Sequence, residues 1–171
     1  MNDKEIASLV KAAISDLYNK QNPSAVKKSV VSDNMTLDLA KALIAKVEEK
    51  AAEMGVNAVV AVSNTAARPV AVECMDDSYI ASYDVALNKA FTVVAIKMAT
   101  TELKQLCQPG GSLYGLELTN GGKIVIFGGG VPLKYNGKII GGLGVSGGSE
   151  EQDTYLAEYG ASVLEEVISC L

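Results

Sequence analysis

The side chains that could bind or transform a ligand occur in two parts of the sequence. Asn88 and Lys89 stand together in a segment with helical apolar periodicity, and both lie off its apolar stripe. Such residues usually belong to a solvated helix face, but Asp84 and Asn88, at i and i+4, could instead point polar groups toward a pocket. Glycine pairs and triplets form the second part, and their exposed backbone amides could bind a carboxylate or a propionate. We therefore predict a ligand-binding set of seven residues: Asn88, Lys89, Gly110, Gly111, Gly128, Gly129 and Gly130.

The absence of histidine limits the chemistry further. The sequence contains none, which excludes Ser-His-Asp and Cys-His catalysis, HExxH metal sites and haem ligated by histidine. Acid–base chemistry would have to use Asp, Glu, Lys, Tyr or Cys. Cys74, Cys107 and Cys170 are far apart and form no CxxC motif, so we interpret them as reduced thiols and predict no metal site.

The segment Gly142–Gly147 has the GxGxxG spacing of a dinucleotide fingerprint. Only one helix is predicted after it, so no second strand remains to complete a βαβ unit. Glu150, Glu151 and Asp153 also place negative charge where a pyrophosphate would have to bind. We interpret these glycines instead as positions where a strand bends or a neighbour approaches the backbone closely.

Composition narrows the classes of partner. The net charge is −5 and the 15 Lys and Arg residues are scattered, which argues against nucleic-acid binding. No apolar run approaches the ~20 residues of a membrane span, and the polar, mixed-charge start is not typical of a secretory signal. We expect a cytoplasmic protein with no membrane or nucleic-acid partner.

Apolar residues at helical spacing predict an amphipathic helix over residues 3–19. The polar stretch that follows has little periodicity and contains Pro23, as linkers do. We therefore divide the chain into an amphipathic helix at 1–20, a linker at 21–34 and a main domain at 35–171. Six side chains form the stripe of the helix, where a partner could bind: Ile6, Leu9, Val10, Ala13, Ile14 and Leu17.

The main domain is predicted to alternate helices with tightly connected strands. Ser149 and Gln152 form the two halves of a capping box before the last helix, and Asn136-Gly137 is a hairpin signal. The fold class is α+β: a five-stranded antiparallel sheet with packed helices, an α/β sandwich. Helices are expected over 36–54, 79–98, 101–106 and 150–169, and strands over 56–63, 68–75, 123–127, 131–135 and 138–145.

The main domain contains several dense motifs, which occupy segments 76–78, 81–82, 88–90, 108–115, 121–133, 141–148 and 151–153. Taken in this order, they resemble the GlcG/HbpS-like family, which includes the C-terminal domain of PduO-type proteins. The resemblance implies an α/β sandwich that assembles into homo-oligomers, with haem or corrinoid bound by some members. Cobalamin adenosyltransferase chemistry belongs to a separate N-terminal domain of PduO-type proteins, and nothing in this chain resembles that domain, so we do not expect this activity.

Haem or cobalamin is thus the candidate cofactor, with no histidine available as an axial ligand. Met75, Met98, Tyr79, Tyr114 or a cysteine would have to ligate a haem iron instead.

Residues 3–17 resemble the encapsulation helices that target cargo proteins to bacterial microcompartments. This resemblance implies that shell proteins are partners, besides further copies of the chain itself. We hypothesise an accessory protein, located inside a microcompartment, that binds a small ligand or a tetrapyrrole, either a corrinoid or haem. Two alternatives stay open: an enzyme acting on a small carboxylate or aldehyde, and a purely structural oligomeric cargo.

Overall fold

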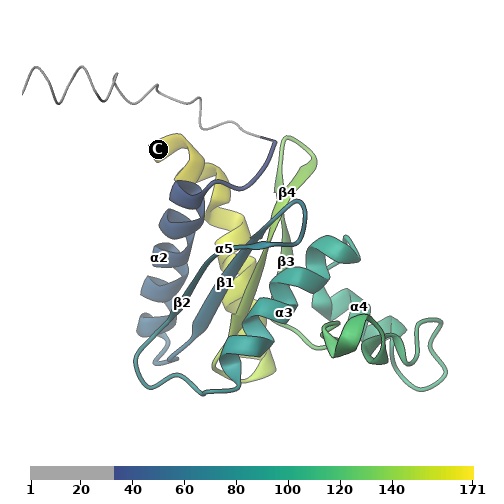
Figure 1. Cartoon of the computed structure of the whole chain (residues 1–171). Coiled ribbons are helices and arrows are strands. Elements are labelled where there is room, and N and C mark those ends of the chain that lie inside the picture. The colour runs from purple at the N-terminus through teal and green to yellow at the C-terminus, as the bar shows by residue number, and fades with distance from the viewer. Residues whose placement is uncertain (1–32) are drawn as a thin grey trace, which may run out of the picture. The chain divides into compact units, whose positions relative to one another are not determined.

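The computed structural model describes residues 33–171, in which helices cover both faces of one antiparallel sheet (Figure 1). The predicted helix at 3–19, with its six stripe residues, lies outside the described residues. The main domain predicted over 35–171 lies within the described residues. None of its helices is long and apolar enough to cross a membrane.

The sheet has four strands in the order β2-β1-β4-β3, and all neighbours are antiparallel. Two hairpins build it, as the sequence predicts: β1 (Val59–Asn64) with β2 (Pro69–Cys74), and β3 (Gly130–Tyr135) with β4 (Lys138–Ser146). Asn136 and Gly137 both have positive φ, at 49° and 76°, which is the requirement of a tight hairpin turn.

The fifth strand predicted over 123–127 is wrong, although two of its apolar residues, Ile124 and Val125, are buried. Ile124 is 3% exposed and packs with Leu103 and Cys107, beside the sheet and not within it. The backbone N–H of Val125 donates to the Thr92 hydroxyl at 3.0 Å, so a helix side chain replaces a neighbouring strand as its partner. A short apolar run indicates burial, but it does not reveal which partner satisfies its backbone.

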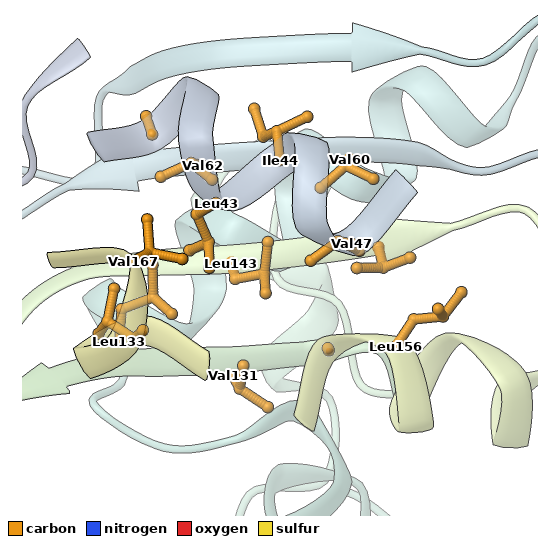
Figure 2. Packing of buried hydrophobic residues seen from close by; sticks show 14 of the residues in the cluster. Leu43, Ile44, Val47, Val60, Val62, Val131, Leu133, Leu143, Leu156 and Val167 are labelled. Atoms are coloured by element: carbon orange, nitrogen blue, oxygen red, sulfur yellow. The ribbon is translucent and has the colours of Figure 1, made fainter. Parts of the chain in front are cut away.

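One face of the sheet is covered by α2 (Leu37–Glu53) and α5 (Glu150–Cys170), and the other by α3 (Ser82–Ala95). The alternation of β1 explains this division, because Val60 and Val62 point to α2 and α5 while Ala61 points to α3. Figure 2 shows the larger core, in which these two valines meet Leu43 of α2 and Leu143 of β4.

Glycines in β4 let α3 approach the sheet closely. A Cβ atom on Gly142 would lie 2.6 Å from the Ala90 carbonyl oxygen, and one on Gly144 would collide with the Ala86 carbonyl oxygen. The glycine spacing that imitates a dinucleotide fingerprint therefore serves helix–sheet packing, as we interpreted it from the sequence.

Two helices begin at local capping signals, whereas a third is shorter than its apolar periodicity predicts. The Thr36 side chain caps α2, and Ser149 forms the predicted capping box with Gln152 at the start of α5. The helix predicted over 79–98 is shorter at both ends, and Lys97, two residues after the end of α3, adopts a left-handed backbone conformation that a continuing helix does not allow. A short helix, α4 (Thr100–Leu106), follows it. Two single 3-10 turns, Leu116–Leu118 and Asn120–Gly122, lie between α4 and β3.

Candidate functional site

Asn88 and Lys89 are neighbours on α3, but their side chains lie in different environments. Lys89 is fully buried, whereas Asn88 is half-buried and lines an open cleft. The solvated helix face is therefore wrong as an explanation of Lys89. Successive residues on a helix point about 100° apart, which allows one to face the sheet while the next faces solvent.

The Lys89 ammonium group forms the centre of a buried cluster at the end of the sheet. Its Nζ donates to the Val145 carbonyl oxygen at 2.7 Å and to Asp153 Oδ2 at 2.8 Å. The Phe127 ring lies over it, with Nζ 4.9 Å from the ring centroid. Burial lowers the pKa of Lys89 below its usual value, and the Asp153 carboxylate opposes that change.

Two carboxylates from the first turn of α5 complete this cluster. Asp153 accepts hydrogen bonds from the amides of Gly147 and Gly148 at 3.1 and 2.9 Å through the oxygen that does not bind Lys89. Glu150 accepts from the Gly128 amide at 2.9 Å and from Lys104 Nζ, and these donors lower the pKa of its carboxyl group. The carboxylates at the start of α5, whose charge argued against a bound pyrophosphate, therefore accept hydrogen bonds from the protein's own amides and lysines.

The candidate ligand site on the solvent side of α3 is a cleft of about 520 Å³, which we call the α3 cleft. Its size lies within the usual range for small-molecule sites, roughly 300–1,000 Å³. The cleft lies between α3, the hairpin turn after β1 and the segment 123–127, which had been predicted as a fifth strand. Its lining residues are Val62, Ser63, Ala66, Ala67, Arg68, Pro69, Leu87, Asn88, Ala90, Phe91 and Lys123.

Hydrogen bonds to the backbone position the two sides of the α3 cleft. The Asn64 side chain accepts from the backbone amides of Ala66 and Arg68 at 3.0 and 3.1 Å, which fixes the hairpin turn. On the other side, the Thr92 hydroxyl binds the Val125 amide and lies 3.3 Å from the Lys123 carbonyl oxygen. Both cationic residues of the cleft are thus carried by anchored backbone.

The α3 cleft combines an apolar wall with positive charge. Leu87 and Phe91 supply apolar surface, while Arg68 and Lys123 are exposed cations. Lys123 Nζ lies 6.0 Å from the centroid of the Phe91 ring. Within residues 33–171 the Asn88 side-chain amide has no hydrogen-bond partner, so it is available to a ligand. This arrangement suits a flat apolar molecule that carries carboxylates.

The predicted ligand-binding glycines do not gather in the α3 cleft. Gly128, Gly129 and Gly130 are buried beside α4, α5 and Lys89, and a Cβ atom on Gly129 would lie 2.6 Å from Lys89 Nζ. Gly110 and Gly111 follow α4, where a side chain on Gly111 would collide with the carbonyl group of Leu106. Four of these five glycines pack against the protein itself, whereas Gly110 is exposed and borders open space.

Sequence reasoning missed Arg68, Lys123, Leu87 and Phe91 as members of one cleft. No motif joins them, because they come from a turn, a helix and a loop. The nearest sequence signal is Asn64, a residue type that is common in turns, four residues before Arg68.

Comparison with known proteins gives consistent results along the described chain. The family model described as haem-degrading protein HbpS-like matches residues 35–162. An uncharacterised 15.0 kDa protein from the dhaT-dhaS intergenic region of Citrobacter freundii is 44% identical over 142 residues, covering 83% of this chain and 100% of that protein.

Two further relatives have informative names. The corrinoid adenosyltransferase PduO of Salmonella typhimurium is 44% identical over 110 residues, which cover 64% of this chain but only 33% of PduO. The crystal structure of a PduOC–haem complex superposes with a TM-score of 0.73 at 39% identity, covering 75% of this chain and 94% of PduOC.

Proposed function

The chain belongs to the HbpS-like family of haem-degrading proteins, and on that premise we propose that it is an accessory protein that binds a tetrapyrrole in the α3 cleft. The observation that carries this proposal is the pairing of an apolar wall with two cations, Arg68 and Lys123, around one cleft. The similarity to PduOC, whose structure contains haem, supports the same ligand class.

The residues of the α3 cleft fit the macrocycle and its carboxylates. Leu87 and Phe91 would pack against the flat apolar ring, and Arg68 and Lys123 would pair with propionates. The cleft does not offer the usual iron ligands. Among the described residues, no methionine, cysteine or tyrosine lines it, and the sequence has no histidine. We therefore infer that the ring and its carboxylates provide the binding energy, and we assign no iron chemistry to the cleft.

Charge favours haem over a corrinoid as the ligand. The periphery of cobalamin carries mostly neutral amides, which gain less from Arg68 and Lys123 than two propionates do. We propose that haem binds to the α3 cleft more tightly than cobalamin does.

An absorbance titration of the full-length protein with haemin tests this proposal. Alanine at Arg68 or Lys123 should weaken binding by up to about fivefold each, as expected for a partly exposed ion pair. Lys134→Ala is a matched control, because Lys134 is an exposed lysine on β3 that does not line the cleft. Equal affinities for the wild type and both cleft variants would place haemin elsewhere. Cobalamin that bound more tightly than haemin would overturn the preference for haem.

We also propose that residues 1–20 target the protein to a microcompartment shell. Support comes from the amphipathic pattern of the sequence, in which an isolated helix of this length gains stability when its apolar stripe is laid in a partner's groove. Deletion of residues 2–20 should leave tetrapyrrole binding unchanged and abolish co-localisation with shell proteins. Unchanged co-localisation would contradict the targeting role.

Self-association is the third part of the proposal. Tyr79, Ile80 and Tyr83 lie together before and at the start of α3 with exposed fractions of 72%, 97% and 47%, an unusual concentration of apolar surface. We expect that copies of the chain bury this surface. Ile80→Glu should then reduce the mass measured by light scattering, whereas Leu118→Glu, at another exposed apolar residue, should not.

A further inference from the structure

A second pocket lies on the opposite side of α3 from the α3 cleft, next to the buried Lys89 cluster. Its volume is about 290 Å³, and Phe127, Asp153, Ser82 and Ser146 are among its lining residues. We call it the Phe127 pocket. It lies near the lower end of the size range of ligand sites, so it suits a small metabolite and not a tetrapyrrole.

Two residues connect the Phe127 pocket to the Lys89 amine. Asp153 lines the pocket and accepts a hydrogen bond from Lys89 Nζ at 2.8 Å. Phe127 lines it as well, and its ring lies over the same nitrogen with a centroid distance of 4.9 Å. Phe127 is 40% exposed, whereas the Lys89 side chain against its ring is fully buried.

We propose that Lys89 is a carbonyl-reactive amine that forms an imine with a small aldehyde or ketone admitted beneath Phe127, with Asp153 as its proton partner. This inference goes beyond tetrapyrrole binding and uses a different pocket. A buried lysine is the kind of amine that proteins use for imine chemistry, because an apolar environment favours its neutral, nucleophilic form. Burial here lowers the pKa of Lys89, with Asp153 and the more distant Glu150 opposing it.

The covalent step balances without any co-reactant. The Lys89 ammonium group gives a proton to Asp153, and the neutral amine adds to the carbonyl carbon to form a carbinolamine. Asp153 returns the proton to the hydroxyl group, which leaves as water while the C=N bond forms. The product is a protonated imine beside the Asp153 carboxylate, whose second oxygen stays bound to the amides of Gly147 and Gly148.

Reductive trapping on the full-length protein tests the proposal. The protein is incubated with acetaldehyde and cyanoborohydride near neutral pH, and ethylation of each lysine is followed by peptide mass spectrometry. The neutral fraction of an amine rises about tenfold for each unit by which its pKa falls. We therefore expect Lys89 to be ethylated faster than exposed lysines such as Lys134.

A bulky aldehyde and one substitution make the test specific to the pocket. Cyclohexanecarbaldehyde should label Lys134 but spare Lys89, and Phe127→Ala should allow it to reach Lys89. Leu118→Ala, at an exposed residue outside the pocket, should change nothing. The proposal is overturned if Lys89 stays unlabelled by acetaldehyde in both wild type and Phe127→Ala while Lys134 reacts, because Lys89 would then be a structural cation only.

Discussion

The buried pair of Lys89 and Asp153 gives a sharp prediction about stability. Lys89→Met keeps most of the buried side-chain volume but removes the ammonium group. Breaking a buried ion pair by removing one partner costs about 3–5 kcal/mol, because the other charge is left uncompensated. Asp153 would retain the amides of Gly147 and Gly148, so we expect a loss near the lower limit, about 3 kcal/mol.

A partly exposed pair in the same region provides the matched control. Lys104 binds Glu150 at 2.7 Å, but their side chains are 39% and 33% exposed. Lys104→Met should therefore cost at most about 1 kcal/mol. Urea denaturation followed by circular dichroism, at one protein concentration and with unchanged m-values, measures both losses. A Lys89→Met protein within about 1 kcal/mol of the wild type would refute the reasoning, since it would mean that the pair is not an essential buried interaction.

Three further predictions concern packing, anchoring and pH. Gly144→Ala should destabilise the fold by about 1–3 kcal/mol in thermal or urea unfolding, because its Cβ atom would collide with the Ala86 carbonyl oxygen; an unchanged stability would contradict the close approach of α3. Thr92→Ala should cost about 1–3 kcal/mol in the same assay, because it leaves the buried Val125 amide without its partner. The lowered pKa of Glu150 means that its interactions stabilise the protein above pH 4.5 and are lost as the pH falls towards the lower, folded-state value. The stability difference between wild type and Glu150→Gln should therefore shrink between pH about 7 and about 3, and a constant difference would contradict this assignment.

Much of the fold could be predicted because its signals are local. The capping box at Ser149, the hairpin turn at Asn136 and the apolar periodicity of α2 each depend on residues close in sequence. The predicted strand over 123–127 failed because its backbone partner, Thr92, is distant in sequence. An apolar run gives no information about such a partner.

The candidate site could be predicted only in part, for a related reason. Asn88 lines the α3 cleft, in line with the alternative that it points toward a pocket. Arg68 and Lys123 line the same cleft only because the tertiary fold brings their segments beside α3. Lys89 was predicted as a ligand-binding residue on an off-stripe helix position, and its burial depends on Asp153 and Val145, which lie 64 and 56 residues further along the chain. Periodicity on one helix cannot show which polar residue finds a buried counter-charge.

Binding of haemin and of metal-free protoporphyrin IX, compared on one preparation, tests the central claim most directly. The claim is that the α3 cleft holds the ring and its carboxylates without an iron ligand. We predict that both porphyrins bind the wild type with affinities within about tenfold of each other, and that both are weakened by about tenfold in the Arg68→Ala/Lys123→Ala double variant. Tight binding of haemin without binding of protoporphyrin IX, undiminished in the double variant, would contradict it.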